Sequence, residues 1–231
     1  MCARRFTIPM LFSMMLAGTV LQAQSTSRTT FGLLIGGTAA KITDIDLGSA
    51  DVFNGTSKQG FRFGLDVGAF VNRSLNDRVS VQPEVHYIQK GTVLDFGGTG
   101  QANGSLKLAF TYIEIPLLLR IDLGSRAAWR PFITAGPTVA MRIGCTGSVD
   151  GDGASLNVDC SEFDNNGATD DPFQKTDIGA SVGAGLTGMM GKRPVLAQLR
   201  YGRGLTTFIK DAEAGQSPKH SVISFIVGVS R

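Results

Sequence analysis

The chain has 231 residues, a net charge of +3 and 18% charged residues, compared with about a quarter in average soluble domains. This balanced charge excludes an electrostatic nucleic-acid binder, which gathers basic residues on one face. The apolar content of 42% excludes intrinsic disorder. Beyond the N-terminal segment there is no apolar run of about 18 residues, the length that a membrane-spanning helix requires.

Residues 1–23 have the three parts of a secretion signal. Arg4 and Arg5 supply a positive end, residues 8–20 form an apolar run, and small residues close the segment. Segments of this kind are removed on export. We therefore predict a signal peptide over residues 1–23 and one mature domain over residues 24–231.

The mature chain alternates apolar and polar residues with a period of two, the pattern of half-buried β-strands. In residues 59–73, for example, the apolar side chains share one face, Arg62 and Asp66 lie on the other, and Phe70 is the exception. A glycine-rich segment precedes this one and similar alternation follows it. The eight strands expected from the pattern contain residues 31–43, 59–73, 79–87, 113–121, 133–142, 177–186, 195–202 and 223–230.

Short and long connections between these strands alternate along the chain. Short turns are expected near residues 74–77, 124–128 and 191–194, and longer polar loops near residues 44–58, 91–105, 144–174 and 210–218. Barrels of bacterial outer membranes have short turns at the periplasmic rim and long loops outside. A closed barrel also leaves no strand edge unpaired in hydrocarbon. The sequence therefore predicts an all-β, eight-stranded antiparallel up-and-down transmembrane barrel, with its apolar faces toward lipid.

The polar face of each strand would then line the barrel interior. Strand parity predicts a lumen network of Arg62, Asp66, Gln82, Glu84, Tyr112, Glu114, Arg120, Arg142, Asp177, Gln198 and Arg200. Four basic and four acidic side chains in this set neutralise one another, because an isolated ion in a narrow lumen costs several kcal/mol. For Glu84 and Glu114 we expect Arg62 or Arg120 as the first partner and Arg200 as the second. The alternative is that these side chains are scattered and hydrated.

Three aromatic residues, Tyr87, Trp129 and Tyr201, fall near predicted strand ends. Outer-membrane barrels carry girdles of aromatic residues at both membrane interfaces. We predict a girdle role for all three, with ordinary packing as the alternative.

The sequence does not support an enzyme. Residues 183–188 match G-x-G-x-x-G and residues 179–183 match G-x-S-x-G, but both motifs require a helix after the strand, and here they lie within a predicted strand. His86 is expected in the lumen near the outer end of its strand, and His220 in solvent at the extracellular rim. We therefore expect no catalytic residue, no cofactor and no metal site.

Cys145 and Cys160 lie 15 positions apart in a chain addressed to an oxidising compartment. This context favours a disulfide, with free thiols or a metal as the alternatives. The loop 144–174 that holds them is acidic and contains no Lys or Arg. Its oxygen-bearing side chains suit Ca²⁺, but the spacing matches no complete calcium loop, so a solvated loop is the main expectation.

Three stretches are similar to a known family. Residues 83–91 (PEVHYIQKG), residues 112–120 (YIEIPLLLR) and residues 135–137 (AGP) resemble the PorT-like outer-membrane β-barrel family of Gram-negative bacteria. The resemblance covers about residues 30–231. It implies an eight-stranded antiparallel barrel in the outer membrane, in a family whose members mostly have no assigned biochemical activity.

The expected function follows from a filled interior, because a barrel of this strand number is just wide enough for its own side chains. We expect a non-enzymatic integral outer-membrane protein with a role in envelope structure, loop-mediated interaction or accessory work in export. Its partners would be outer-membrane lipid, the barrel-insertion machinery and an extracellular or envelope protein. The alternative is a soluble exported β-barrel that binds a small apolar ligand, as lipocalins do, and in that barrel the charged faces would meet water.

Overall fold

The computed structural model describes residues 28–43, 58–96, 104–124, 128–151, 154–159, 173–207, 209 and 217–231. These ranges hold β1 (Thr29–Thr43), β2 (Lys58–Ser74), β3 (Val79–Phe96), β4 (Gly104–Asp122), β5 (Arg130–Gly151), β6 (Ala154–Asp159), β7 (Thr176–Met190), β8 (Arg193–Gly204) and β9 (Lys219–Ser230). None of these ranges contains a helix that could cross a bilayer. The predicted signal peptide lies outside them.

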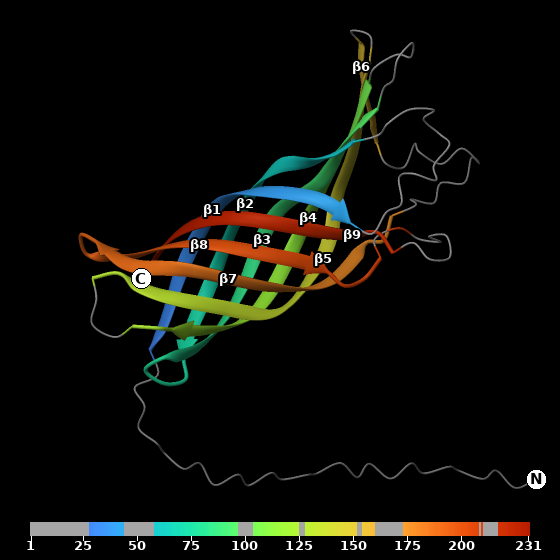
Figure 1. Ribbon diagram of the computed structural model, residues 1–231. Coiled ribbons are helices and arrows are strands. Elements are labelled where there is room, and N and C mark those ends of the chain that lie inside the picture. The colour runs from blue at the N-terminus through green and yellow to red at the C-terminus, as the bar shows by residue number, and fades with distance from the viewer. Residues whose placement is uncertain are drawn as a thin grey trace, which may run out of the picture.

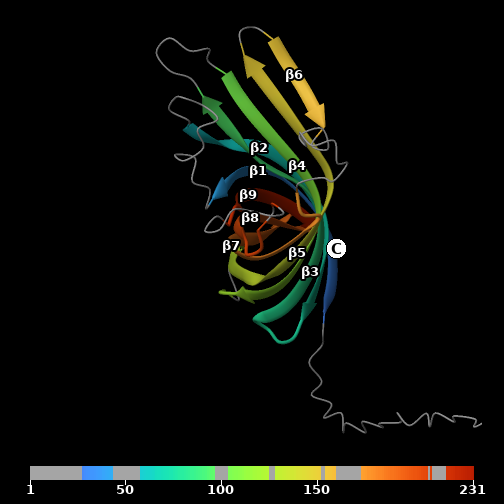
Figure 2. The ribbon, with the colours of Figure 1, turned by 90° about the vertical axis from the view of Figure 1, so that its right-hand side faces the viewer.

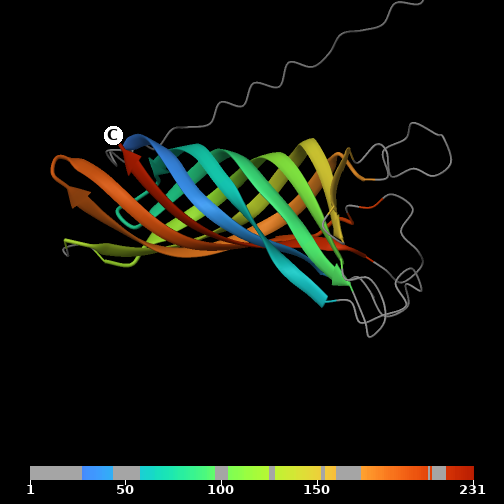
Figure 3. The same cartoon turned by 90° about the horizontal axis from the view of Figure 1, so that it is seen from above.

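Eight of the strands form a closed antiparallel barrel, as the sequence predicts (Figure 1). Each strand pairs with its neighbour in the chain, and β1 pairs with β9 to close the ring. The exception is β6, which pairs only with β5, so that β5 continues the barrel by pairing with β7. The strands are steeply tilted when the barrel is seen from above (Figure 3), and tilt is what allows a sheet to close on itself.

The short connections gather at one end of the barrel, which we call the short-turn rim. Between β2 and β3, the Asn76 side chain accepts hydrogen bonds from the main-chain N–H groups of Arg78 and Val79, a local bond typical of turns. Between β7 and β8, Gly191 has a φ of 64°, which a two-residue hairpin turn requires and which glycine adopts without strain. The strand ends at the opposite end of the barrel define what we call the long-loop rim.

Several strands extend farther toward the long loops than the sequence alternation predicted. β3 continues to Phe96 and β4 begins at Gly104, so most of the predicted loop 91–105 is paired strand. Residues 144–151 extend β5 and pair with β4 and β6, which corrects part of the predicted loop 144–174. These strands project beyond the rest of the barrel (Figures 1 and 2). Antiparallel neighbours satisfy their backbone groups in water as well as in lipid, so polar composition does not end a ladder.

The outer face of the barrel is apolar on all eight strands. Exposed residues there include Leu33, Phe63, Val85, Leu117, Val139, Val182, Leu199 and Phe225. Of the predicted girdle residues, Trp129 lies beside a short turn and Tyr201 lies near the end of β8, both on the surface. Tyr87 is also on the surface but lies midway along β3, because that strand continues beyond the predicted end.

Candidate functional site

Strand alternation brings most of the predicted lumen residues into the interior. The buried ones are Asp66, Gln82, Glu84, Tyr112, Glu114, Arg120, Asp177, Gln198 and Arg200. Arg62 and Arg142 are only partly buried, on the parts of β2 and β5 nearer the long-loop rim. In a soluble, ligand-binding barrel the charged faces would meet water. The structure instead buries Asp66, Glu84, Glu114 and Arg120, so the polar face points inward, which disfavours that alternative.

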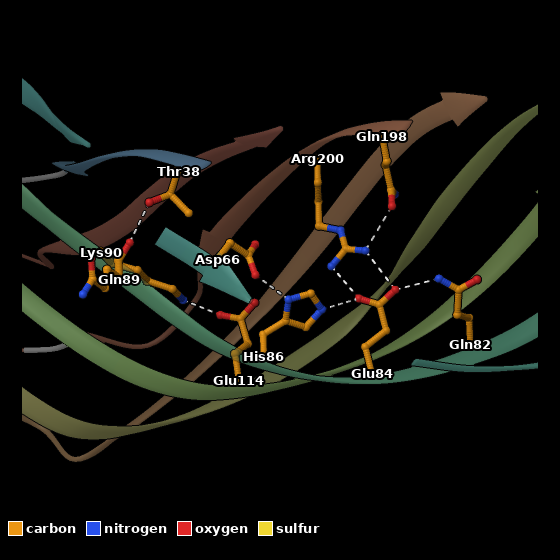
Figure 4. Close-up of polar contacts among 10 residues, drawn as sticks. All are labelled: Thr38, Asp66, Gln82, Glu84, His86, Gln89, Lys90, Glu114, Gln198 and Arg200. Atoms are coloured by element: carbon orange, nitrogen blue, oxygen red, sulfur yellow. Dashed lines mark hydrogen bonds and ion pairs between the residues drawn. The ribbon is translucent and has the colours of Figure 1, made fainter. Parts of the chain in front are cut away.

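Glu84 is the centre of the buried polar network (Figure 4). Its Oε2 accepts a hydrogen bond from Arg200 Nη1 at 2.6 Å, and its Oε1 accepts from Arg200 Nη2 at 2.9 Å. Oε1 also accepts from Gln82 Nε2 at 2.7 Å. The Glu84 side chain is 0% exposed, so protein groups rather than water satisfy the carboxylate. A two-pronged arginine–carboxylate pair of this kind is both strong and geometrically specific.

His86 lies between two carboxylates. Its Nε2 is 2.6 Å from Glu84 Oε2, and its Nδ1 is 2.6 Å from Asp66 Oδ1 (Figure 4). Only the imidazolium form has an N–H donor on both ring nitrogens, so this geometry suits a positively charged histidine. Asp66, Glu84, His86 and Arg200 then form a set with no net charge, which we call the central ion set. His86 was expected in the lumen, but its two carboxylate partners were not.

The central ion set is extended toward the short-turn rim by uncharged polar side chains. Arg200 Nη2 donates to Gln198 Oε1 at 3.2 Å, and Gln198 Nε2 donates to Thr134 Oγ1 at 2.6 Å. Gln82 Oε1 accepts from Asn72 Nδ2 at 3.0 Å. These bonds hold the side chains that flank Glu84 in one arrangement.

A second polar cluster lies nearer the long-loop rim. Lys90 donates to Glu114 within the lumen (Figure 4), so the prediction of Arg62 or Arg120 as the partner of Glu114 is wrong. Lys90 has the inward parity of β3, and it was missed because the strand was expected to end at residue 87. Asp177 accepts a hydrogen bond from Thr206 Oγ1 at 2.9 Å.

His220 is buried, with 1% exposure, and the expectation that it is solvated is therefore wrong. Its Nε2 is 3.2 Å from the Tyr112 hydroxyl, and the ring packs edge-on against Phe110 and Tyr112 at centroid distances of 5.4 and 5.7 Å. The residue follows Lys219 at the start of β9, near the rim as expected, but the aromatic side chains of Phe110 and Tyr112 from β4 cover it across the lumen.

The remaining predicted arginines have separate surroundings. Arg120 donates to Asp122 Oδ1 at 2.8 Å and lies 3.8 Å above the Phe132 ring, near the short-turn rim. Arg142 Nη2 donates to the main-chain oxygen of Phe173 at 3.1 Å. Arg62 has a buried Nη1 that finds no acceptor among the described residues. None of the three contacts Glu84 or Glu114 through a described hydrogen bond.

Two apolar layers enclose the polar part of the lumen. The layer toward the short-turn rim consists of Leu34, Phe70, Phe132, Leu196 and Ile226. The layer toward the long-loop rim consists of Ala40, Ile42, Ile88, Phe110, Tyr112, Ala140, Cys145 and Val222. Phe70, which breaks the alternation of β2, therefore has a place inside the barrel. Between the layers there is a polar cavity of about 20 Å³, which has room for about one water molecule.

The projecting strands carry the described part of the acidic segment. Asp150 accepts a hydrogen bond from Lys107 Nζ at 2.7 Å, which holds the pKa of the Asp150 carboxyl below its ordinary value. Cys145 is buried and pairs with Phe110 across β4 and β5, while Cys160 lies outside the described residues. Within the described ranges no three His, Cys, Asp or Glu side chains are placed to hold a metal.

The geometry agrees with what comparison with known proteins finds. A family model described as outer membrane protein beta-barrel domain matches residues 22–210. The chain belongs to this family. The protein is therefore located in the outer membrane. A search of curated proteins finds no match.

Several solved structures resemble the barrel at low sequence identity. The outer membrane protein OprG from Pseudomonas aeruginosa is 15% identical, over 89% of this chain and 97% of that chain, with a TM-score of 0.48. Neisserial surface protein A is 16% identical, over 86% and 96%, with a TM-score of 0.40. Ail of Yersinia pestis is 10% identical, over 88% and 99%, with a TM-score of 0.39.

Proposed function

We propose that this outer-membrane barrel is non-enzymatic and does not conduct solutes, and that it acts in envelope structure, through partners of its loops, or as an accessory in export. The observation that carries the proposal is the filled lumen. The central ion set occupies its middle, apolar layers lie on both sides, and the cavity between these layers is about 20 Å³. A wider vestibule of about 860 Å³ lies at the short-turn end, lined by Asn72, Ser80 and Arg120 among others, and the apolar layer with Phe70 and Leu196 separates it from the central ion set. A solute would have to displace paired buried ions, which is costly.

If no solute passes through the lumen, the protein acts through its surface and its loops. The charged residues of the central ion set, and Lys90 with Glu114, are engaged with one another rather than arranged around a free space, which supports a stabilising role for them. The motifs at residues 83–91 and 112–120 supply several of these residues, including Glu84, His86 and Glu114. On this basis we propose membership of the PorT-like branch, in which these motifs would serve the lumen network.

We also propose the disulfide between Cys145 and Cys160. In the ladder of β5 and β6, Thr146 pairs with Asp159, and these two residues are the chain neighbours of the cysteines. Opposed residues in an antiparallel ladder have Cα atoms about 4.5–5.5 Å apart, within the range that a disulfide spans. The bond would tie the base of the projecting strands.

Reconstitution tests the proposed lack of conduction. The purified protein is inserted into planar lipid bilayers beside a general diffusion porin, and insertion is checked by heat-modifiable gel mobility. We expect current steps from the porin and none from this protein. Reproducible current steps from the folded, inserted protein would refute the filled-lumen proposal.

A further inference from the structure

A furrow on the outer face of the barrel lies close to the short-turn rim. It has a volume of about 560 Å³ and crosses β1, β2 and β3, with the start of β8 and the end of β9 at one side. It is separate from the lumen network described above, because its walls are mostly side chains that point outward.

The register explains why a furrow forms here. Leu33 pairs with Ala69, and Ala69 pairs with Val85, so the smallest of three neighbouring outward side chains lies in the middle. Leu33 is 66% exposed and Val85 is 46% exposed, and they stand as walls on either side of the alanine. The floor and walls are apolar, and the furrow runs parallel to the strands.

Two arginines stand where the furrow meets the rim. Arg193 begins β8 directly after the Gly191 turn, and Arg231 exchanges main-chain hydrogen bonds with Phe31 at 2.8 and 3.1 Å. Both side chains are exposed and line the furrow. Neither guanidinium forms an ion pair with any described residue, so both charges are available to a ligand.

The rim around them is basic as well. Among its described residues the exposed ionic side chains are Arg28, Arg73, Arg78, Arg130, Lys192, Arg193 and Arg231, with Asp77 as the single exposed acid. An apolar furrow that ends at a cationic rim complements an amphiphile with a chain and an anionic head. Arginine forks pair with phosphate oxygens, often through two parallel hydrogen bonds.

We propose that this furrow binds an anionic phospholipid, with an acyl chain over Ala69 and the phosphate on Arg193 and Arg231. The proposal rests on the orientation in which the short turns face the periplasm, where the membrane leaflet consists of phospholipid. Such a lipid would be bound specifically through its head group, unlike the bulk lipid that surrounds any outer-membrane barrel.

Native mass spectrometry of the detergent-solubilised protein tests the proposal. The protein is incubated with an equal mixture of phosphatidylglycerol and phosphatidylcholine, and in a parallel arm with lipid A. We expect one retained phosphatidylglycerol in preference to the other lipids. Arg193→Gln and Arg231→Gln should each lower that preference about tenfold, the equivalent of one lost charge-assisted hydrogen bond. Ala69→Phe should abolish retention by filling the furrow, with the rim charge unchanged.

Lys58→Gln is the matched control, because Lys58 is an exposed basic residue at the opposite rim, and we expect it to retain phosphatidylglycerol like the unmodified protein. Equal retention of the two phospholipids, preferential retention of lipid A, or full retention by the arginine and Ala69 variants would each overturn the proposal. Heat-modifiable mobility confirms that every variant is folded. The lipid count does not depend on conductance, so this test and the test of the filled lumen can fail separately.

Discussion

Replacing Glu84 by alanine is expected to destabilise the barrel by about 3–5 kcal/mol, the cost of removing one partner of a buried ion pair. The substitution leaves the Arg200 guanidinium and the His86 ring facing a space that held their shared carboxylate. Because the Glu84 side chain is 0% exposed, water does not reach the two cations without rearrangement of the lumen.

The structure places this loss at the upper part of that range. Glu84 accepts contacts from Arg200, His86 and Gln82 at 2.6–2.9 Å, and each hydrogen bond to a charged group contributes roughly 1.5–3 kcal/mol. These contributions share one carboxylate and are therefore not additive. Among the residues that the structure describes, Glu114 has one ion-pair partner, Lys90, so Glu114→Ala should cost less than Glu84→Ala.

Denaturant unfolding in lipid vesicles measures the effect, followed by heat-modifiable mobility and by the fluorescence of the one tryptophan in the chain, Trp129. The double variant Glu84→Ala with Arg200→Ala should recover part of the loss, because the stranded guanidinium is gone. Asp150→Ala is the control, since its exposed pair with Lys107 contributes little. If Glu84→Ala unfolds at the same denaturant concentration as this control, the lumen is hydrated and the reasoning is wrong.

Two further predictions concern the loops. Mass spectrometry of non-reduced peptides should find Cys145 linked to Cys160, and two free thiols would contradict the proposed disulfide. For the orientation, a cysteine introduced at Asn165 should react with an impermeant reagent on intact cells, whereas one introduced at Gly191 should be protected. Labelling at Gly191 with none at Asn165 would reverse the barrel in the membrane.

The alternation of apolar and polar residues along each segment was enough to predict which side of its strand each side chain occupies. A strand presents successive side chains on opposite sides whatever it pairs with, so Asp66, Glu84 and Arg200 could be assigned to one face without knowledge of the fold. Counting the alternating segments supplied the strand number, and the alternation of short and long connections pointed to an outer-membrane barrel. Lys90 was missed only because the predicted end of its strand came too early.

The tertiary structure decided which inward residues meet. Glu84 on β3 pairs with Arg200 on β8, 116 positions away in the chain, on strands from opposite sides of the ring. The burial of His220 likewise depends on aromatic side chains that reach it from β4. Parity states only that a side chain points inward. Its height in the lumen follows from the tilt and stagger of the closed sheet, which belong to the ring of strands as a whole, and contacts across the lumen require two side chains at the same height.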